Sequence, residues 1–60
     1  NEAQVHTEGQ TTVVTAQEGV NVVEAFDSIN GAAPVSLGAT TKVTLSSYDT
    51  RSHAIIFVTK

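Results

Sequence analysis

The sequence predicts a single, mainly β domain, built as a small antiparallel sheet or sandwich of about five short strands. The β-branched residues Val and Thr, which suit pleated surfaces, are abundant throughout the chain. Long unbranched residues that favour helices are scarce: Leu occurs only at Leu37 and Leu45, and Lys only at Lys42 and Lys60. Short apolar runs alternate with turn residues such as Gly, Asn and Ser.

The small size of the chain limits its core. A domain of about 60 residues buries only about 60% of the surface that its unfolded chain exposes. The chain has no Cys, so no disulfide can strengthen the fold. Stability must therefore come from a thin core or from association, which favours a homo-oligomer or a polymer.

Charge and hydropathy exclude some partners and indicate a location. The net charge is −3, and only Lys42, Arg51 and Lys60 are basic, so we expect no nucleic-acid binding. The longest apolar run, Ala54–Val58, is far shorter than the roughly 20 residues of a membrane span, so we expect no membrane insertion. A first residue other than Met and little Lys suit an exported chain that has lost its leader and is extracellular or on the cell surface.

The N-terminal residues 1–10 are polar apart from Val5 and Ala3. We expect a flexible arm or an extended segment that pairs with a sheet edge, its own or that of a neighbouring molecule. Residues 11–60 would then form the domain.

The first strand of this domain is predicted at Thr11–Thr15, because the stretch TTVVT is almost entirely β-branched. Residues 16–19 look like a turn, and Val20–Phe26 would be the return strand. On this register the facing pairs are Thr15 with Val20 and Val13 with Val22.

A short helix near Asn21–Asn30 is the alternative, and it would make the fold α+β, with the helix packed on a β-hairpin sheet. Asn21 could cap the helix with Glu24 as its capping-box partner, and Gly31 would follow its end. The valines at its start argue against an isolated helix.

Asn30-Gly31 is a strong turn signal that matches a type I′ β-hairpin. Pro34 cannot donate a hydrogen bond to a sheet, which places Ala33–Leu37 at an edge.

The C-terminal residues 42–60 predict a second hairpin. Its strands are Lys42–Tyr48 and His53–Thr59, joined by the polar loop Asp49–Ser52. A four-residue loop implies the facing pairs Tyr48–His53, Leu45–Ile56 and Val43–Val58, of which the last two form an apolar core face.

The opposite face of this hairpin is the candidate interface. Ile55 and Phe57 would point away from the core, beside the short side chain of Thr44, which cannot bury them. We therefore expect these side chains to meet another subunit. The predicted interface residues are Ile55, Phe57, Tyr48, Thr44 and Val5.

Side chains that could carry chemistry are few. His6 and His53 are the only imidazoles, and no closely spaced ligand pair predicts a metal site. Asp49, Arg51 and His53 lie close together, but a hairpin tip is too open for catalysis, and Asp49 is expected to bond its own backbone. His53 is interpreted as a surface partner of Tyr48. We expect no enzyme activity and no cofactor.

Two functional hypotheses follow. The first is an exported, non-enzymatic structural subunit that self-assembles through β-sheet surfaces into a fibre, coat or surface layer. The second is a small secreted binding module or inhibitor, which docks on one protein partner through the same face or through the Asp49–Ser52 loop.

Overall fold

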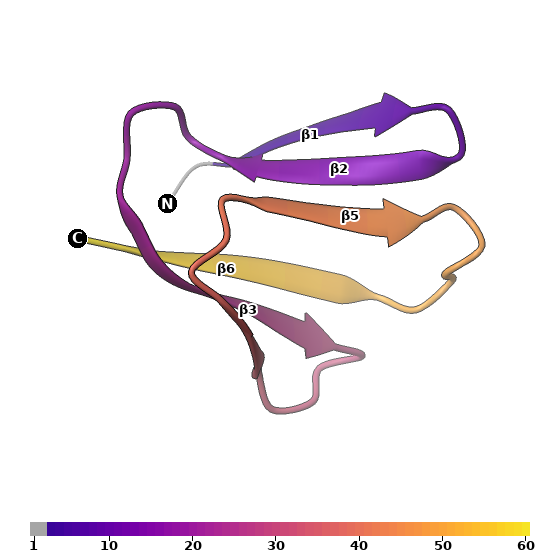
Figure 1. Ribbon diagram of the computed structural model, residues 1–60. Coiled ribbons are helices and arrows are strands. Elements are labelled where there is room, and N and C mark those ends of the chain that lie inside the picture. The colour runs from indigo at the N-terminus through magenta and orange to yellow at the C-terminus, as the bar shows by residue number, and fades with distance from the viewer. Residues whose placement is uncertain (1–2) are drawn as a thin grey trace.

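A computed structural model describes residues 3–60 and shows six β-strands and no helix in this range (Figure 1). The strands are β1 (Ala3–Glu8), β2 (Thr11–Ala16), β3 (Val22–Ile29), β4 (Val35–Gly38), β5 (Lys42–Ser46) and β6 (His53–Thr59). They form two antiparallel sheets of three strands, sheet A in the order β1-β2-β5 and sheet B in the order β4-β3-β6. The mainly β prediction is confirmed, and the alternative helix near Asn21–Asn30 is wrong, because strand β3 occupies this stretch.

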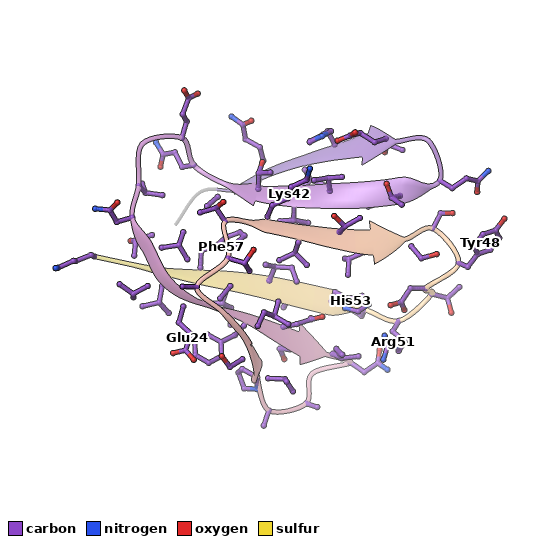
Figure 2. The ribbon with its side chains drawn as sticks, in the orientation of Figure 1. Glu24, Lys42, Tyr48, Arg51, His53 and Phe57 are labelled. Carbon is purple, nitrogen blue, oxygen red and sulfur yellow. The ribbon has the colours of Figure 1, made fainter. Side chains whose placement is uncertain are left out.

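The two sheets pack face to face as a small sandwich. The buried cluster combines Val14 of sheet A with Ala25 and Phe57 of sheet B, and Figure 2 shows Phe57 between the two layers. Four partly buried side chains surround it: Ala16, Val22, Val43 and Ile55. The alternation of side chains along each strand supplies this core from one face of each sheet.

The chain crosses between the sheets three times. Hairpin β1–β2 belongs to sheet A and hairpin β3–β4 to sheet B. Strand β5 then returns to sheet A beside β2, and β6 returns to sheet B beside β3. Residues 3–8, which were expected to be a flexible or strand-donating arm, form β1 and pair with β2 of the same chain.

The turn between β3 and β4 has the geometry that the sequence predicts. Asn30 and Gly31 both have positive φ, 53° and 75°, as a type I′ turn requires. The amide of Ala32 donates to the carbonyl of Ile29 over 3.0 Å and closes the turn. Pro34 lies just before β4, which is an edge strand, as expected.

The pairing predicted for the C-terminal hairpin is wrong. Strand β5 pairs with β2, so Leu45 faces Thr12 and Val43 faces Val14. Strand β6 pairs with β3, so Ile56 faces Phe26. The pairs Leu45–Ile56, Val43–Val58 and Tyr48–His53 do not form. The segment 47–52 connects the two sheets instead of folding β6 back along β5, a choice that local turn residues do not specify.

The faces predicted for β6 are also reversed. Phe57 is only 4% exposed, and Ile55 is partly buried against the core, whereas Ile56 is 43% exposed. Successive side chains of β6 do alternate between two faces, but Ile55 and Phe57 point inward instead of outward. The reason is that β6 lies across the core from sheet A rather than beside β5.

The predicted hairpin of residues 11–26 is likewise wrong, since β2 and β3 lie in different sheets. The expected pairs Thr15–Val20 and Val13–Val22 are therefore absent. Val13 instead lies on the outer face of sheet A between His6 and Thr44, where these neighbours leave it only 2% exposed.

Candidate functional site

His53, the first residue of β6, lies between two carboxylates. Its Nδ1 is 2.8 Å from Oδ2 of Asp27 on β3, and its Nε2 is 2.8 Å from Oδ2 of Asp49 in the β5–β6 loop. The imidazole is only 8% exposed. Because ionised carboxylates only accept hydrogen bonds, this arrangement is fully satisfied when both ring nitrogens carry a proton. The site therefore favours the imidazolium cation.

Arg51 holds the second of these carboxylates in a fork. Its Nε donates to Oδ1 of Asp49 and its Nη2 to Oδ2, both over 2.9 Å. The backbone amide of Arg51 also donates to Oδ1 over 3.1 Å, which confirms the expected bond from Asp49 to its own turn. These donors, the guanidinium first, hold the pKa of Asp49 well below its usual range.

The pKa of His53 is raised above its usual value, chiefly by the hydrogen bond to Asp27 and further by the bond to Asp49. Burial opposes this shift but does not cancel it. Two carboxylates thus alternate with two cations in the order Asp27, His53, Asp49, Arg51, so the cluster balances its own charge.

Backbone hydrogen bonds join the loops around this cluster. The amide of Asn30 donates to the carbonyl of Ser52 over 2.8 Å, and the amide of Ser52 donates to Oδ1 of Asn30 over 3.0 Å. The amide of Ser47 donates to the carbonyl of Gln10 over 2.8 Å. The β1–β2, β3–β4 and β5–β6 loops are therefore tied together at one end of the sandwich, where Figure 2 shows Tyr48 projecting outward.

The cluster has residue types that also occur in acid–base sites. A general base needs a free nitrogen lone pair, and both nitrogens of His53 face carboxylates. One oxygen of Asp27, Oδ1, is buried without a hydrogen-bond partner. Within residues 3–60 no group of three or more His, Cys, Asp or Glu side chains is placed to hold a metal ion. The arrangement acts as an ionic clamp between β3, β6 and the loop.

The interpretation of His53 as a surface partner of Tyr48 is wrong. The Tyr48 side chain is 81% exposed, whereas His53 is enclosed. The partner that sequence reasoning missed is Asp27. The sequence held no direct signal for this partner: alternation from Val22 places Asp27 on the opposite face of the strand, and the irregularity in pairing between Val22 and Glu24 reverses that assignment.

The outer faces of the two sheets differ in polarity. Cross-strand register and strand alternation assign nine residues to the outer face of sheet A: Gln4, His6, Glu8, Thr11, Val13, Thr15, Lys42, Thr44 and Ser46. Its single apolar member, Val13, is covered by its neighbours. The outer face of sheet B carries seven residues: Glu24, Phe26, Ser28, Ser36, Ala54, Ile56 and Val58. Four of these are apolar, and Ile56 and Val58 are 43% and 41% exposed.

The predicted interface residues do not form one surface. Ile55 and Phe57 lie in the core, so their expected outward orientation is wrong. Tyr48 is at the loop end, and Thr44 is on the outer face of sheet A. Val5 faces the core side of sheet A, opposite Val14, yet is 66% exposed at the overhanging edge strand β1. A role of Tyr48, Thr44 and Val5 in an interface stays a prediction.

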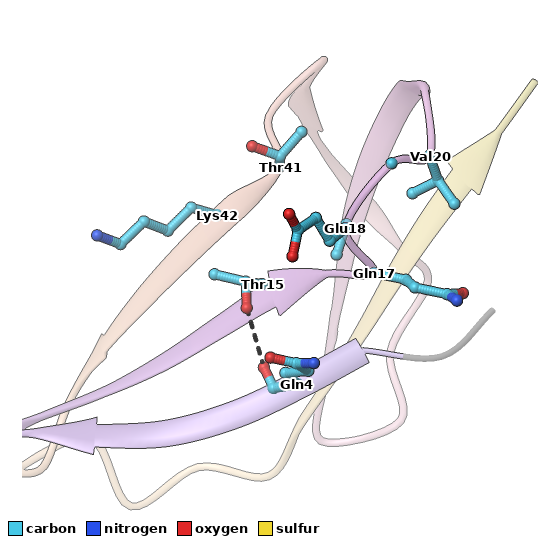
Figure 3. A pocket seen from close by; sticks show the side chains of 9 residues that line it. Gln4, Thr15, Gln17, Glu18, Val20, Thr41 and Lys42 are labelled. Atoms are coloured by element: carbon cyan, nitrogen blue, oxygen red, sulfur yellow. Dashed lines mark hydrogen bonds between the residues drawn. The ribbon is translucent and has the colours of Figure 1, made fainter.

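An open hollow of about 430 Å³ lies where the start of β1, the end of β2 and the start of β5 meet the β2–β3 loop (Figure 3). Its polar groups include the Thr15 hydroxyl, which is 3.5 Å from the Gln4 carbonyl, and the exposed side chains of Glu18 and Lys42. Figure 3 shows the Lys42 ammonium group directed away from Glu18, so the charged groups do not converge on one point.

Comparison with protein-family models, with curated proteins and with solved structures found no match. In the part of the chain that the structure describes, no helix has the length and apolar character needed to cross a membrane.

Proposed function

We propose that this chain is a non-enzymatic structural subunit, exported from the cell, that self-assembles through its β-sheet surfaces into a fibre, coat or surface layer. The observation that carries the proposal is that exposed large apolar side chains outnumber buried apolar side chains. Within residues 4–60 only four are buried, namely Val13, Val14, Ala25 and Phe57. Seven large ones are exposed, namely Val5, Val23, Val35, Leu37, Tyr48, Ile56 and Val58.

This balance makes association favourable. Burial of apolar surface stabilises a fold by about 25 cal/mol per Å², and the part of these side chains that stays exposed contributes nothing of this kind in an isolated chain. Of these side chains, Ile56 and Val58 lie together on the outer face of sheet B, and contiguous exposed apolar surface is typical of an interaction site. A subunit that covers such surface with further copies gains stability that its own thin core does not supply.

Other features support the remaining parts of the proposal. Both nitrogens of His53 are engaged by carboxylates, which supports a structural rather than a catalytic use of the ionic clamp. The net charge of −3 argues against nucleic acid as a partner. The Thr-rich, Lys-poor composition supports an extracellular or cell-surface location.

Sedimentation velocity and thermal unfolding at several protein concentrations test this function. We expect the sedimentation coefficient and the midpoint temperature, followed by circular dichroism, to rise together with concentration, because association stabilises the folded state by mass action. A monomer whose midpoint does not change with concentration would contradict the proposal.

One observation favours the second candidate, a secreted module that docks on a protein partner. Tyr48 is 81% exposed on a loop that the Asp49–Arg51 fork and the bonds of Ser52 hold in place. An exposed aromatic side chain on a preorganised loop is typical of a binding hot spot. A chain that stays monomeric at all concentrations would favour this candidate, and Tyr48→Ala is the variant whose partner binding should then be compared with the wild type.

A further inference from the structure

We propose that the ionic clamp is a pH-sensitive switch for the β5–β6 loop. While the imidazole of His53 carries both of its protons, the middle of this loop is held against the end of β3. When the ring loses one proton, residues 48–51 are released while the rest of the sandwich stays folded. This inference goes beyond the proposed function and does not depend on self-assembly.

Three contacts fix the β5–β6 loop. At its two ends, the backbone amides of Ser47 and Ser52 donate to the β1–β2 and β3–β4 loops over 2.8 and 3.0 Å. Between them, Oδ2 of Asp49 is 2.8 Å from Nε2 of His53. The two end contacts join amide and carbonyl groups, which do not titrate, so they persist when the pH changes. The contact in the middle of the loop depends on the proton at Nε2.

The charged groups that face the imidazole come from two elements. Strand β3 contributes Asp27, and the β5–β6 loop contributes Asp49, with Arg51 bound behind it. In the part of the chain that the structure describes, no other charged side chain forms an ion pair or a hydrogen bond with the ring. Asp27 first and Asp49 second raise the pKa of His53, so the midpoint of proton loss lies above the ordinary value of 6.5.

The needs of the two carboxylates decide which contact is lost. A neutral imidazole has one N–H group, so it can donate to only one of them. Asp27 is buried, its Oδ1 has no hydrogen-bond partner, and its Oδ2 faces Nδ1 of His53. Asp49 keeps three other donors, which all belong to Arg51. An unpaired buried carboxylate costs more free energy than a carboxylate that keeps other donors, so the remaining proton stays at Nδ1.

Loss of the proton at Nε2 makes the contact with Asp49 repulsive. The nitrogen lone pair then faces an ionised carboxylate oxygen over 2.8 Å, with no proton between them. Asp49 lies on a loop rather than on a strand, so it can move away together with Arg51. Tyr48, which precedes Asp49 and is largely exposed, moves with them. The switch therefore changes how the chain presents the side chain that the second candidate function would use for binding.

The fluorescence of Tyr48 tests this release, because the chain has no other Tyr and no Trp. The decay of its anisotropy is compared at about pH 5.5 and about pH 8.5, below the unfolding temperature. We expect a larger share of the anisotropy to be lost in the fast phase at the higher pH, since this phase reports local motion of the loop. Circular dichroism should show the same β-sheet content at both pH values.

Two variants identify the titrating group. In His53→Gln the fast phase should be equally large at both pH values, because the loop is no longer held by an imidazolium. His6→Gln is the control and should behave like the wild type, since His6 pairs with Glu8 at the surface.

Several results would overturn the inference. One is a fast phase in the wild type that does not change with pH, and another is a pH-dependent fast phase in His53→Gln. Loss of the β-sheet signal at the higher pH would show that proton loss unfolds the whole chain rather than the loop. These measurements do not report self-assembly, so such a failure leaves the proposed function standing.

A second measurement needs no variant and remains decisive if His53→Gln does not fold. Nitrogen-15 NMR of the wild type distinguishes the ring nitrogen that keeps its proton from the nitrogen that loses it. As the pH rises, we expect Nε2 of His53 to become the bare nitrogen and Nδ1 to stay protonated, facing Asp27. A bare Nδ1 would mean that the ring releases β3 instead of the loop, which would overturn the inference.

Discussion

Phe57 is the side chain through which β6 closes the core, where it contacts Val14 and Ala25 in the buried cluster. Phe57→Ala should cost about 3–5 kcal/mol of unfolding free energy, because it removes a buried aromatic ring from a very small core. Urea denaturation at low protein concentration measures this loss. If the total stability is about 5 kcal/mol, as is common for small domains, such a variant keeps at most about 2 kcal/mol.

Ile56→Ala is the matched control, since Ile56 precedes Phe57 on the same strand but is 43% exposed. In the monomer it should cost about 1 kcal/mol or less. A larger loss for Ile56→Ala than for Phe57→Ala would mean that the orientation of β6 is the reverse of the one described.

His53 gives the stability of the fold a pH dependence. Its pKa is raised in the folded state, so its contribution is fully present below its ordinary pKa of 6.5 and is lost as the pH rises through the folded value. The pKa of Asp49 is lowered, so its contribution is present above its ordinary pKa of 3.8 and is lost as the pH falls through the folded value. The two groups together predict the greatest stability in mildly acidic solution.

Urea denaturation at about pH 5.5 and about pH 8.5 measures this dependence. We expect the wild type to be more stable at the lower pH. His53→Gln should be less stable than the wild type at the lower pH and should lose most of the difference between the two conditions. His6→Gln is the control, because His6 lies at the surface beside Glu8. An unchanged pH dependence in His53→Gln would exclude the clamp as its source.

At the scale of single elements, the β3–β4 turn depends on two residues with positive φ, Asn30 and Gly31. Gly31→Val should cost about 1–3 kcal/mol, because a β-branched residue is strained at a φ of 75°. Gly31→Asn should cost less, since Asn tolerates the left-handed region. Thermal denaturation of both variants checks this difference, and equal effects would contradict the type I′ assignment.

Sequence reasoning located the strands better than it paired them. Strand β6 was placed at His53–Thr59 with its true bounds, and the turn at Asn30-Gly31 was predicted because turn chemistry is local. The choice of β2 as the partner of β5 was not predictable in this way, since alternation in a short strand is compatible with any neighbour. The pairing of β5 with β2 depends on which arrangement of all the strands buries the core.

The same distinction applies to the ionic clamp. The contact between Asp49 and Arg51 spans two residues and follows from local turn chemistry. The contact between Asp27 and His53 joins residues 26 apart, and it exists because β3 and β6 are neighbours in sheet B. Because the strand pairing was predicted wrongly, the contact between Asp27 and His53 was missed. For the same reason His53 was assigned to the surface, although its side chain is enclosed.

At the scale of the molecule, the sandwich has two unlike outer surfaces around one thin core. Sheet A presents polar side chains and shields its single outward valine, whereas sheet B presents Phe26, Ile56 and Val58. The two outer surfaces therefore differ in what they would gain from being covered: the apolar surface of sheet B would gain, and the polar surface of sheet A would not.

The three crossings between the sheets also set the order in which the chain can acquire its structure. The hairpins β1–β2 and β3–β4 can form early, but isolated hairpins are at best marginally stable in water. Each sheet is completed by a strand from much later in the chain, and the most buried aromatic ring lies on the last strand, β6. During synthesis on the ribosome the first four strands therefore have no core to fold around. We therefore expect cooperative folding to begin only once residue 57 has emerged from the exit tunnel, and we expect this nonlocal topology to make folding slow for so short a chain.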